Sequence, residues 1–440
     1  MIVGVQAIPA CFDVEQHRVS CPPEALAVHF QAYDTLLRHP VRADTEGFRA
    51  ADASDLEPGL AHAWEASTDG HTYTFQLRQG VVSAEGHELT AHDVKWSWDR
   101  AFALNSWSAR ASRACGVTSP DDVRVVQPHI LQFRLAEPHP RFPAMLATPL
   151  PPIYDLETVR QHCPVGDPWG DAWLRGHVAG FGAYALEEGA DAEEAALDAN
   201  LTYWEGPARE RRVLLRAIPA SSARADSLWR GSLDAADGLS MADLPALEGK
   251  PEVRLWQFPG SRQVVLRVDA AFAPFDQAPV RQALALALPY EEIGRQVFTS
   301  AHSRPVRAEQ DQRAARTLLR EAGYASGFRM TINVPQGDPD LEATAQIIQR
   351  DLMRLDLKVV VERLDRPLFT REKASRHLPI YLEERRAVAP LLSIEEMEPL
   401  PQVETLLLAQ PADCFATRAN VEGFVRRPDG QPRYMELWKA

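Results

Sequence analysis

The residues best suited to bind a metal ion stand in the segment His87-Glu88-Leu89-Thr90-Ala91-His92. In a zinc-protease helix the two histidines are about four residues apart, so that both lie on one face. Here they are five residues apart and would lie on different faces. Thr90 and Asp93 instead have the spacing of a capping box, which predicts the start of a helix. We expect a surface turn followed by a helix, and no metal site.

A glycine-rich segment, Gly180-Phe181-Gly182-Ala183-Tyr184-Ala185, fits the degenerate pattern of a dinucleotide-binding loop. That pattern requires a strand before the loop and a helix after it. Glu187 and Glu188 follow, and their charges would repel a pyrophosphate at a helix N-terminus. We therefore expect no nucleotide here, and the sequence predicts no other cofactor.

Patterns of nucleophilic catalysis are absent from the sequence. There is no G-x-S-x-G turn and no phosphate-binding P-loop, and the five cysteines form no C-x-x-C pair. The chain is therefore predicted to have no catalytic residues and not to be an enzyme. Arg385-Arg386 follows the apolar Ile380-Tyr381-Leu382, where such a pair either binds a carboxylate or marks a solvated strand end.

The composition indicates a large soluble globular chain. Of 440 residues, 45% are apolar and 25% are charged, with 61 acidic residues against 47 basic ones. The formal charge of −14 argues against binding to nucleic acid, which needs a basic surface. No apolar run reaches the roughly 18 residues that a membrane-spanning helix needs. The length favours two or three domains.

Hydrophobic periodicity predicts a mixed α/β fold. Residues 71–78 alternate between apolar and polar side chains, which is typical of a half-buried strand. The order strand, helix, strand over 328–361 predicts a βαβ unit and therefore a parallel sheet. We also expect a first strand at 2–5, a helix at 24–37, a hairpin at 123–135, and strand-like residues at 434–438.

An ordered set of short motifs runs through most of the chain. It includes Pro58-Gly59-Leu60-Ala61, Leu89-Thr90-Ala91-His92-Asp93-Val94, Gly180 to Leu186, Arg224 to Asp234, and Val280-Arg281-Gln282-Ala283-Leu284. Together these closely resemble the signature of the peptide/nickel-type, family 5 extracellular solute-binding proteins of ABC importers. The resemblance spans roughly residues 20 to 440.

The resemblance implies a two-lobed α/β fold of the type II periplasmic-binding-protein class, with an extra subdomain inserted in lobe I. Such proteins take up a ligand in the cleft between the lobes by hinge closure. The implied division is lobe I at 1–44, the inserted subdomain at 45–170, lobe I again at 171–258, lobe II at 259–410, and a C-terminal return to lobe I at 411–440.

The sequence departs from the family where a ligand would be held. The segments 299–309 and 383–410 are compressed. Residues 383–412 contain no Asp, although peptide binders of the family place there the Asp that holds the ligand's α-ammonium. Either Glu383 or Glu384 replaces that carboxylate, or Arg385 or Arg386 faces the cleft and the ligand is anionic. Expected ligand contacts are Trp107, Tyr184, Glu384, Arg385 and Arg386.

The resemblance also sets the expected partners. We expect a small-molecule or peptide ligand, an ABC transporter permease if the chain is exported, a monomer, and a periplasmic or extracellular location. The first eleven residues lack the basic start of a signal peptide, which leaves a cytoplasmic location open. The alternative functions on this scaffold are a shortened ligand-sensing domain of a transcription regulator and a biosynthetic enzyme.

Overall fold

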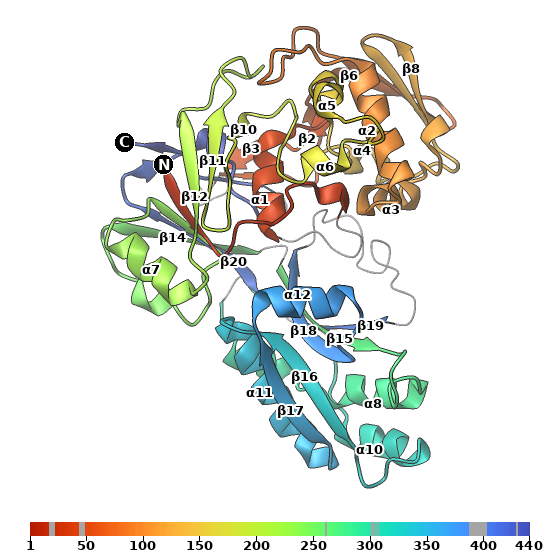
Figure 1. Ribbon diagram of the computed structural model, residues 1–440. Helices are drawn as coiled ribbons and strands as arrows, with labels where there is room; N and C mark the ends of the chain where they lie inside the picture. Colours follow the sequence, from red (N-terminus) through yellow and green to blue (C-terminus); the bar gives the residue numbers. More distant parts are fainter. Residues whose placement is uncertain are drawn as a thin grey trace.

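Two sheets organise the molecule (Figure 1). The structure is a computed structural model that describes residues 1–16, 23–43, 49–259, 262–300, 303, 306, 308–386, 403–427 and 430–440. Side chains at positions 23, 259, 386 and 403 are not described.

The first sheet contains the first strand of the chain and a strand from its C-terminal part. Within the described ranges it has seven strands in the order β10 (Tyr184–Leu186), β11 (Glu194–Ala199), β12 (Arg212–Ala217), β1 (Ile2–Val5), β13 (Ala235–Asp237), β20 (Ala412–Arg418) and β14 (Val253–Pro259). β1 runs parallel to β12 on one side and to β13 on the other. The strand predicted at 2–5 is therefore confirmed, and it lies inside the sheet because Val3 and Val5 are buried.

The second sheet has five described strands in the order β17 (Lys358–Leu364), β16 (Arg329–Pro335), β18 (Ile380–Arg386), β15 (Arg262–Asp269) and β19 (Val403–Ala409). β16 and β17 are parallel and are joined by α11 (Pro339–Leu352), so the predicted βαβ unit is confirmed. The other helices of this part are α8 (Ala278–Ala287), α9 (Tyr290–Gln296), α10 (Gln312–Glu321) and α12 (Arg366–Ala374).

A two-stranded antiparallel ribbon connects the two sheets. β14 pairs with β20 in the first sheet, up to Pro259 opposite Ala412. The same two stretches of chain continue as β15 and β19, which pair in the second sheet from Val264 opposite Ala409. The chain therefore crosses between the lobes at two neighbouring positions, an arrangement that allows bending about a common axis.

A third layer lies on the first lobe. Its sheet has the order β6 (Ala61–Ala66), β7 (Thr72–Leu77), β9 (Ile130–Arg134) and β8 (Val123–Gln127), which confirms the predicted strand at 71–78 and the hairpin. Thr90 caps the covering helix, and the capping box with Asp93 is complete as predicted. The helices of this layer are α2 (Ala91–Ala103), α3 (Trp107–Ala114), α4 (Phe142–Met145), α5 (Leu156–His162) and α6 (Asp171–Leu174).

The remaining elements are short. α1 (Pro23–Ala32) and α7 (Ser221–Trp229) flank the first sheet, and 3-10 turns cover Val14–Gln16, Pro120–Asp122, Leu244–Ala246, Met353–Leu355 and Tyr434–Glu436. The small strands are β2 (Leu37–Arg38), β3 (Val41–Ala43), β4 (Arg49–Ala51), β5 (Glu57–Pro58), β21 (Val421–Glu422), β22 (Val425–Arg426) and β23 (Trp438–Lys439).

Two expectations about element boundaries are wrong. The helix predicted at 24–37 ends at Ala32, because Asp34 turns the chain by accepting hydrogen bonds from the side chains of Tyr203 and Trp204. The strand-like stretch at 434–438 is a 3-10 turn followed by the two-residue β23. At the end of α1, a contact with a distant part of the chain outweighs the local pattern.

Candidate ligand pocket between the lobes

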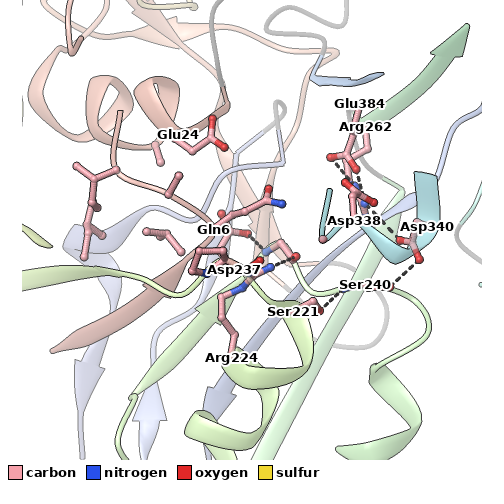
Figure 2. A pocket seen from close by; sticks show the side chains of 18 of the residues that line it. Gln6, Glu24, Ser221, Arg224, Asp237, Ser240, Arg262, Asp338, Asp340 and Glu384 are labelled. Atoms are coloured by element: carbon pink, nitrogen blue, oxygen red, sulfur yellow. Dashed lines mark hydrogen bonds and ion pairs between the residues drawn. The ribbon is translucent and has the colours of Figure 1, made fainter. Parts of the chain in front are cut away.

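A pocket of about 70 Å³ lies between the two lobes. One wall follows the carboxyl ends of the parallel strands β1, β12 and β13, and the other follows the carboxyl ends of β16 and β18, which are also parallel to each other. Open α/β sheets place ligand sites outside the carboxyl ends of their strands. Figure 2 shows Gln6, Glu24, Arg224 and Asp237 on the first wall, opposite Arg262, Asp338, Asp340 and Glu384 on the second.

The first wall contains a buried arginine. Arg224, on α7, is 1% exposed and donates hydrogen bonds to the backbone carbonyls of Ile218, Pro219 and Gly238. None of the described carboxylates lies within ion-pair distance of its guanidinium, and its Nε–H is buried without a hydrogen-bond acceptor among them. Burial lowers the pKa of Arg224 to about 10, so the side chain stays positively charged at neutral pH.

The second wall is built mainly from carboxylates. Asp338 is the N-cap of α11, and its side chain accepts a hydrogen bond from the backbone N–H of Leu341 at 3.1 Å. Glu384, near the end of β18, accepts two hydrogen bonds from Arg262 at the start of β15, one of them 2.9 Å from Nε. Asp340 lies 3.8 Å from the same guanidinium.

The pKa values of two carboxyl groups on this wall are raised. Burial, together with the nearby charges of Glu384 and Asp340, raises the pKa of Asp338 to about 6. Burial likewise raises the pKa of Asp340, although Arg262 opposes that shift. Arg262 keeps its proton because its pKa is raised well above the ordinary value: Glu384 and Asp340 more than offset the effect of burial.

Two of the polar contacts between the described parts of the lobes border this pocket. The Ser240 hydroxyl, in the loop after β13, donates a hydrogen bond of 2.6 Å to Asp340 of α11. Arg366, at the first turn of α12, places its guanidinium 3.9 Å from Glu24 in the first lobe and 3.7 Å from Asp338 in the second. The distances between the side chains that bound the pocket therefore depend on the position of one lobe relative to the other.

Two of the predicted contact residues lie in hydrophobic cores and do not line this pocket. Trp107 begins α3 and is 4% exposed in the core of the 61–134 layer. Tyr184 lies in β10, is 2% exposed, and donates its hydroxyl hydrogen to the backbone carbonyl of Glu210 at 2.9 Å. Both side chains are held by packing that has no opening toward the second lobe.

The other three predicted residues are on β18. Glu384 lines the pocket, as described above. Arg385 is 9% exposed on the opposite face of the strand, where its charge helps to lower the pKa of the buried Glu383. Arg386 ends the strand, and its side chain lies outside the described residues. Because neighbouring residues of a strand face opposite sides, Glu384 and Arg385 cannot both point into one pocket.

Several wall residues were not predicted from the sequence. Gln6, Glu24, Arg224, Asp237, Arg262, Asp338 and Asp340 all line the pocket. The signal for Asp338 and Asp340 was present: an Asp-Pro-Asp stretch stands directly after a buried strand of a predicted parallel unit. The carboxyl end of such a strand is where ligand-binding side chains collect.

Neither a metal site nor a membrane-spanning helix occurs among the described residues. No group of three or more His, Cys, Asp or Glu side chains in the described part of the chain is placed to hold a metal ion. None of the helices in that part combines the length and apolar character that crossing a membrane requires. The pocket is therefore characterised by its charged and hydrogen-bonding side chains.

Solved structures identify the fold. The periplasmic binding protein DppA from Helicobacter pylori, in complex with the peptide STSA, has a TM-score of 0.80 at 18% identity, covering 100% of this chain and 98% of that one. AgaA from A. tumefaciens, in complex with agropinic acid, has a TM-score of 0.78 at 17% identity, covering 100% and 98%. The chain thus has the two-lobed fold of type II periplasmic binding proteins, as predicted.

Sequence comparison shows the family. The profile of the bacterial extracellular solute-binding proteins, family 5 (middle region), matches residues 55–390, so the chain belongs to family 5 of these proteins. The probable D,D-dipeptide-binding periplasmic protein DdpA of Escherichia coli K12 is 27% identical over 293 residues, 66% of this chain and 53% of DdpA. Heme-binding protein A of Haemophilus influenzae is 25% identical over 339 residues, 70% of this chain and 61% of that protein.

Proposed function

We propose that this protein is the solute-binding component of an ABC importer and captures a small peptide-like or other polar solute between its lobes. The observation that carries the proposal is the inter-lobe pocket at the carboxyl ends of parallel strands from both sheets. Membership in family 5 and the peptide-binding names of relatives support it.

Closure about the two-stranded ribbon is the proposed mode of capture. At about 70 Å³, the pocket is smaller than the roughly 300–1,000 Å³ typical of small-molecule sites. A solute of dipeptide size would therefore enter a more open arrangement and be enclosed as the lobes approach. Contacts such as Ser240 with Asp340 form only when the lobes are close together, so they would favour the closed state.

The division into lobes is part of the same proposal. We assign lobe I to 1–44 and 171–258, the inserted subdomain to 45–170, lobe II to 259–410, and the return to 411–440. The sheet order supports these limits, since strands from residues 2–5, 184–259 and 412–418 share one sheet and strands from 262–409 share the other. The partner that receives the solute would be the membrane permease of an ABC transporter, which the protein would meet in the periplasm or outside the cell.

A ligand screen tests the proposed function. A library of dipeptides, tripeptides, glutathione and opines is added to the purified protein, and the unfolding temperature is measured for each compound. A true ligand at about 100 times its Kd should add about 2.7 kcal/mol to the free energy of unfolding. The same compound should reduce the radius of gyration in small-angle X-ray scattering. If no compound raises the unfolding temperature or compacts the protein, the proposed function is wrong.

A further inference from the structure

We propose that the pocket selects solutes that carry a guanidinium group, which binds between the carboxylates of Glu24 in one lobe and Asp338 in the other. This inference rests on the proposed function and names the chemical class of its ligand. Of the two alternatives that the sequence left open, it favours a carboxylate partner for a cationic ligand group over an anionic ligand bound by Arg385 or Arg386.

The charge of the pocket is the first observation. Among the described residues that line it, five are carboxylates and two are guanidinium groups, which leaves a formal charge of −3. Arg262 is already committed to Glu384 and Asp340, and Arg224 to backbone carbonyls. The carboxylates of Glu24 and Asp338 line the same pocket and share one cation among the described residues, Arg366.

The chain's own Arg366 is the second, independent observation. Its guanidinium lies between Glu24 and Asp338 at 3.9 and 3.7 Å, which is beyond hydrogen-bond distance for both. The arrangement therefore attracts a cation but does not hold it by a direct hydrogen bond. A ligand cation that enters closer to these two oxygens would gain the charge-assisted hydrogen bonds that Arg366 does not make.

Polar groups without partners lie on the first wall. The Nε–H of Arg224, in a side chain 1% exposed, donates to no described residue, and the half-buried amide of Gln6 makes no hydrogen bond with any of them. An acceptor on the ligand, such as a carbonyl or a carboxylate, would satisfy these donors. The class that fits both walls is a cationic solute with an acceptor group nearby.

Affinity for matched solutes tests the inference. L-Arginine and L-citrulline have the same shape, but only arginine carries a side-chain cation; the dipeptides Gly-Arg, Gly-citrulline and Gly-Glu extend the comparison. We expect the arginine compounds to bind at least about tenfold more tightly than their citrulline counterparts by calorimetry, as loss of one charged hydrogen bond implies. Gly-Glu should bind most weakly.

Asp338→Asn is the decisive variant. Asparagine is as good an N-cap as aspartate, so α11 keeps its cap while the charge is lost. We expect this variant to lose most of the preference for arginine over citrulline. Glu24→Gln, in the other lobe, should have the same effect. The matched control is Asp311→Asn, the N-cap of α10, which does not line the pocket and should leave the preference unchanged.

The pH dependence of binding gives a second readout. Because the pKa of Asp338 is about 6, a cation must bind its ionised form, and the affinity should rise between pH 5 and pH 7 in the wild type. Asp338→Asn should remove that part of the rise. The charged groups that act on Asp338 are Glu384, Asp340 and Arg366. Glu24 shares Arg366 with Asp338, and Arg262 pairs with Glu384 and Asp340.

The outcomes separate the two proposals. If the ligands that bind and compact the protein are neutral or anionic, with citrulline compounds equal to arginine compounds, the cation inference is wrong and the proposed function stands. If the preference for arginine survives both Asp338→Asn and Glu24→Gln, the cation binds elsewhere and the assigned site is wrong. If no compound of the library binds, both the proposed function and the cation inference are wrong.

Discussion

Glu15 does not line the pocket, but it is a buried acid of the first lobe with a strongly raised pKa. It is 1% exposed, and its carboxylate accepts hydrogen bonds from the hydroxyls of Ser106 and Ser108. Burial raises its pKa to about 7, although the two serines and Arg100 oppose the shift. Its ionised form is therefore poorly accommodated in the folded protein.

This gives a prediction with a definite sign. Since the pKa of Glu15 is higher in the folded protein than in the unfolded chain, the stability that it contributes is present below pH 4.5 and lost as the pH rises through 7. Glu15→Gln should therefore unfold at a higher denaturant concentration at pH 8, with a gain on the order of 2 kcal/mol. At pH 4.5 the variant and the wild type should differ little.

Equilibrium urea unfolding at the two pH values measures this. Glu157→Gln, an exposed position in the first turn of α5, is the control and should show no such difference. Equal stability of wild type and Glu15→Gln at pH 8 would mean that the buried carboxylate is better solvated than its surroundings indicate.

At the scale of elements, the glycine-rich segment 180–182 owes its composition to packing. The backbone N–H of Gly182 donates to the carbonyl of Ala32 at 2.9 Å, where α1 ends. A Cβ at Gly182 would lie 2.4 Å from the carbonyl carbon of Ala32 and 2.5 Å from the Gln31 oxygen. The segment therefore resembles a dinucleotide loop only because both need close approach of backbones.

Gly182→Ala should consequently destabilise the first lobe. The contact is backbone against backbone and cannot be relieved by rotating a side chain, so we expect a loss of about 2–3 kcal/mol in the free energy of unfolding. Gly176→Ala is the control, because a Cβ there meets nothing within 4 Å. A Gly182→Ala variant as stable as Gly176→Ala would show that the two segments can move apart at little cost.

Elements with strong local signals were predictable from the sequence. The alternation of Tyr73, Phe75 and Leu77 marked β7, and Thr90 with Asp93 marked the start of α2. The end of α1 was not predictable, because it depends on Asp34 accepting hydrogen bonds from residues about 170 positions away. A local sequence pattern predicts the element that a segment can form by itself. Contacts with distant residues then determine where that element begins and ends.

At the scale of the whole molecule, buried polar contacts at the pocket help to hold one lobe against the other. Asp340 of the second lobe accepts the Ser240 hydroxyl of the first, and both side chains are buried. Arg262 links the two crossings of the ribbon, since it donates to the Ala412 carbonyl at 3.2 Å and also contacts Glu384. The balance between open and closed arrangements should therefore respond to single substitutions.

Ser240→Ala tests that balance. Removing the hydroxyl leaves Asp340 with one hydrogen bond fewer, which should shift the ligand-free equilibrium toward open arrangements by roughly tenfold. Fluorescence energy transfer between labels on α7 and α12 measures the change. Ser232→Ala, whose hydroxyl bonds to Ser227 within the first lobe, is the control. An unchanged distance distribution would mean that the ribbon alone sets the arrangement.

The sequence by itself determined the class of fold, the parallel unit at 328–361, the main strands and helix starts, and the family, because these depend on local periodicity and on ordered motifs. Only the tertiary structure decided which side chains meet between the lobes. Ser240 and Asp340 are 100 residues apart, and Glu24 meets Asp338 through Arg366. Strand alternation also decided that Glu384 lines the pocket while Arg385 lies on the opposite face of β18.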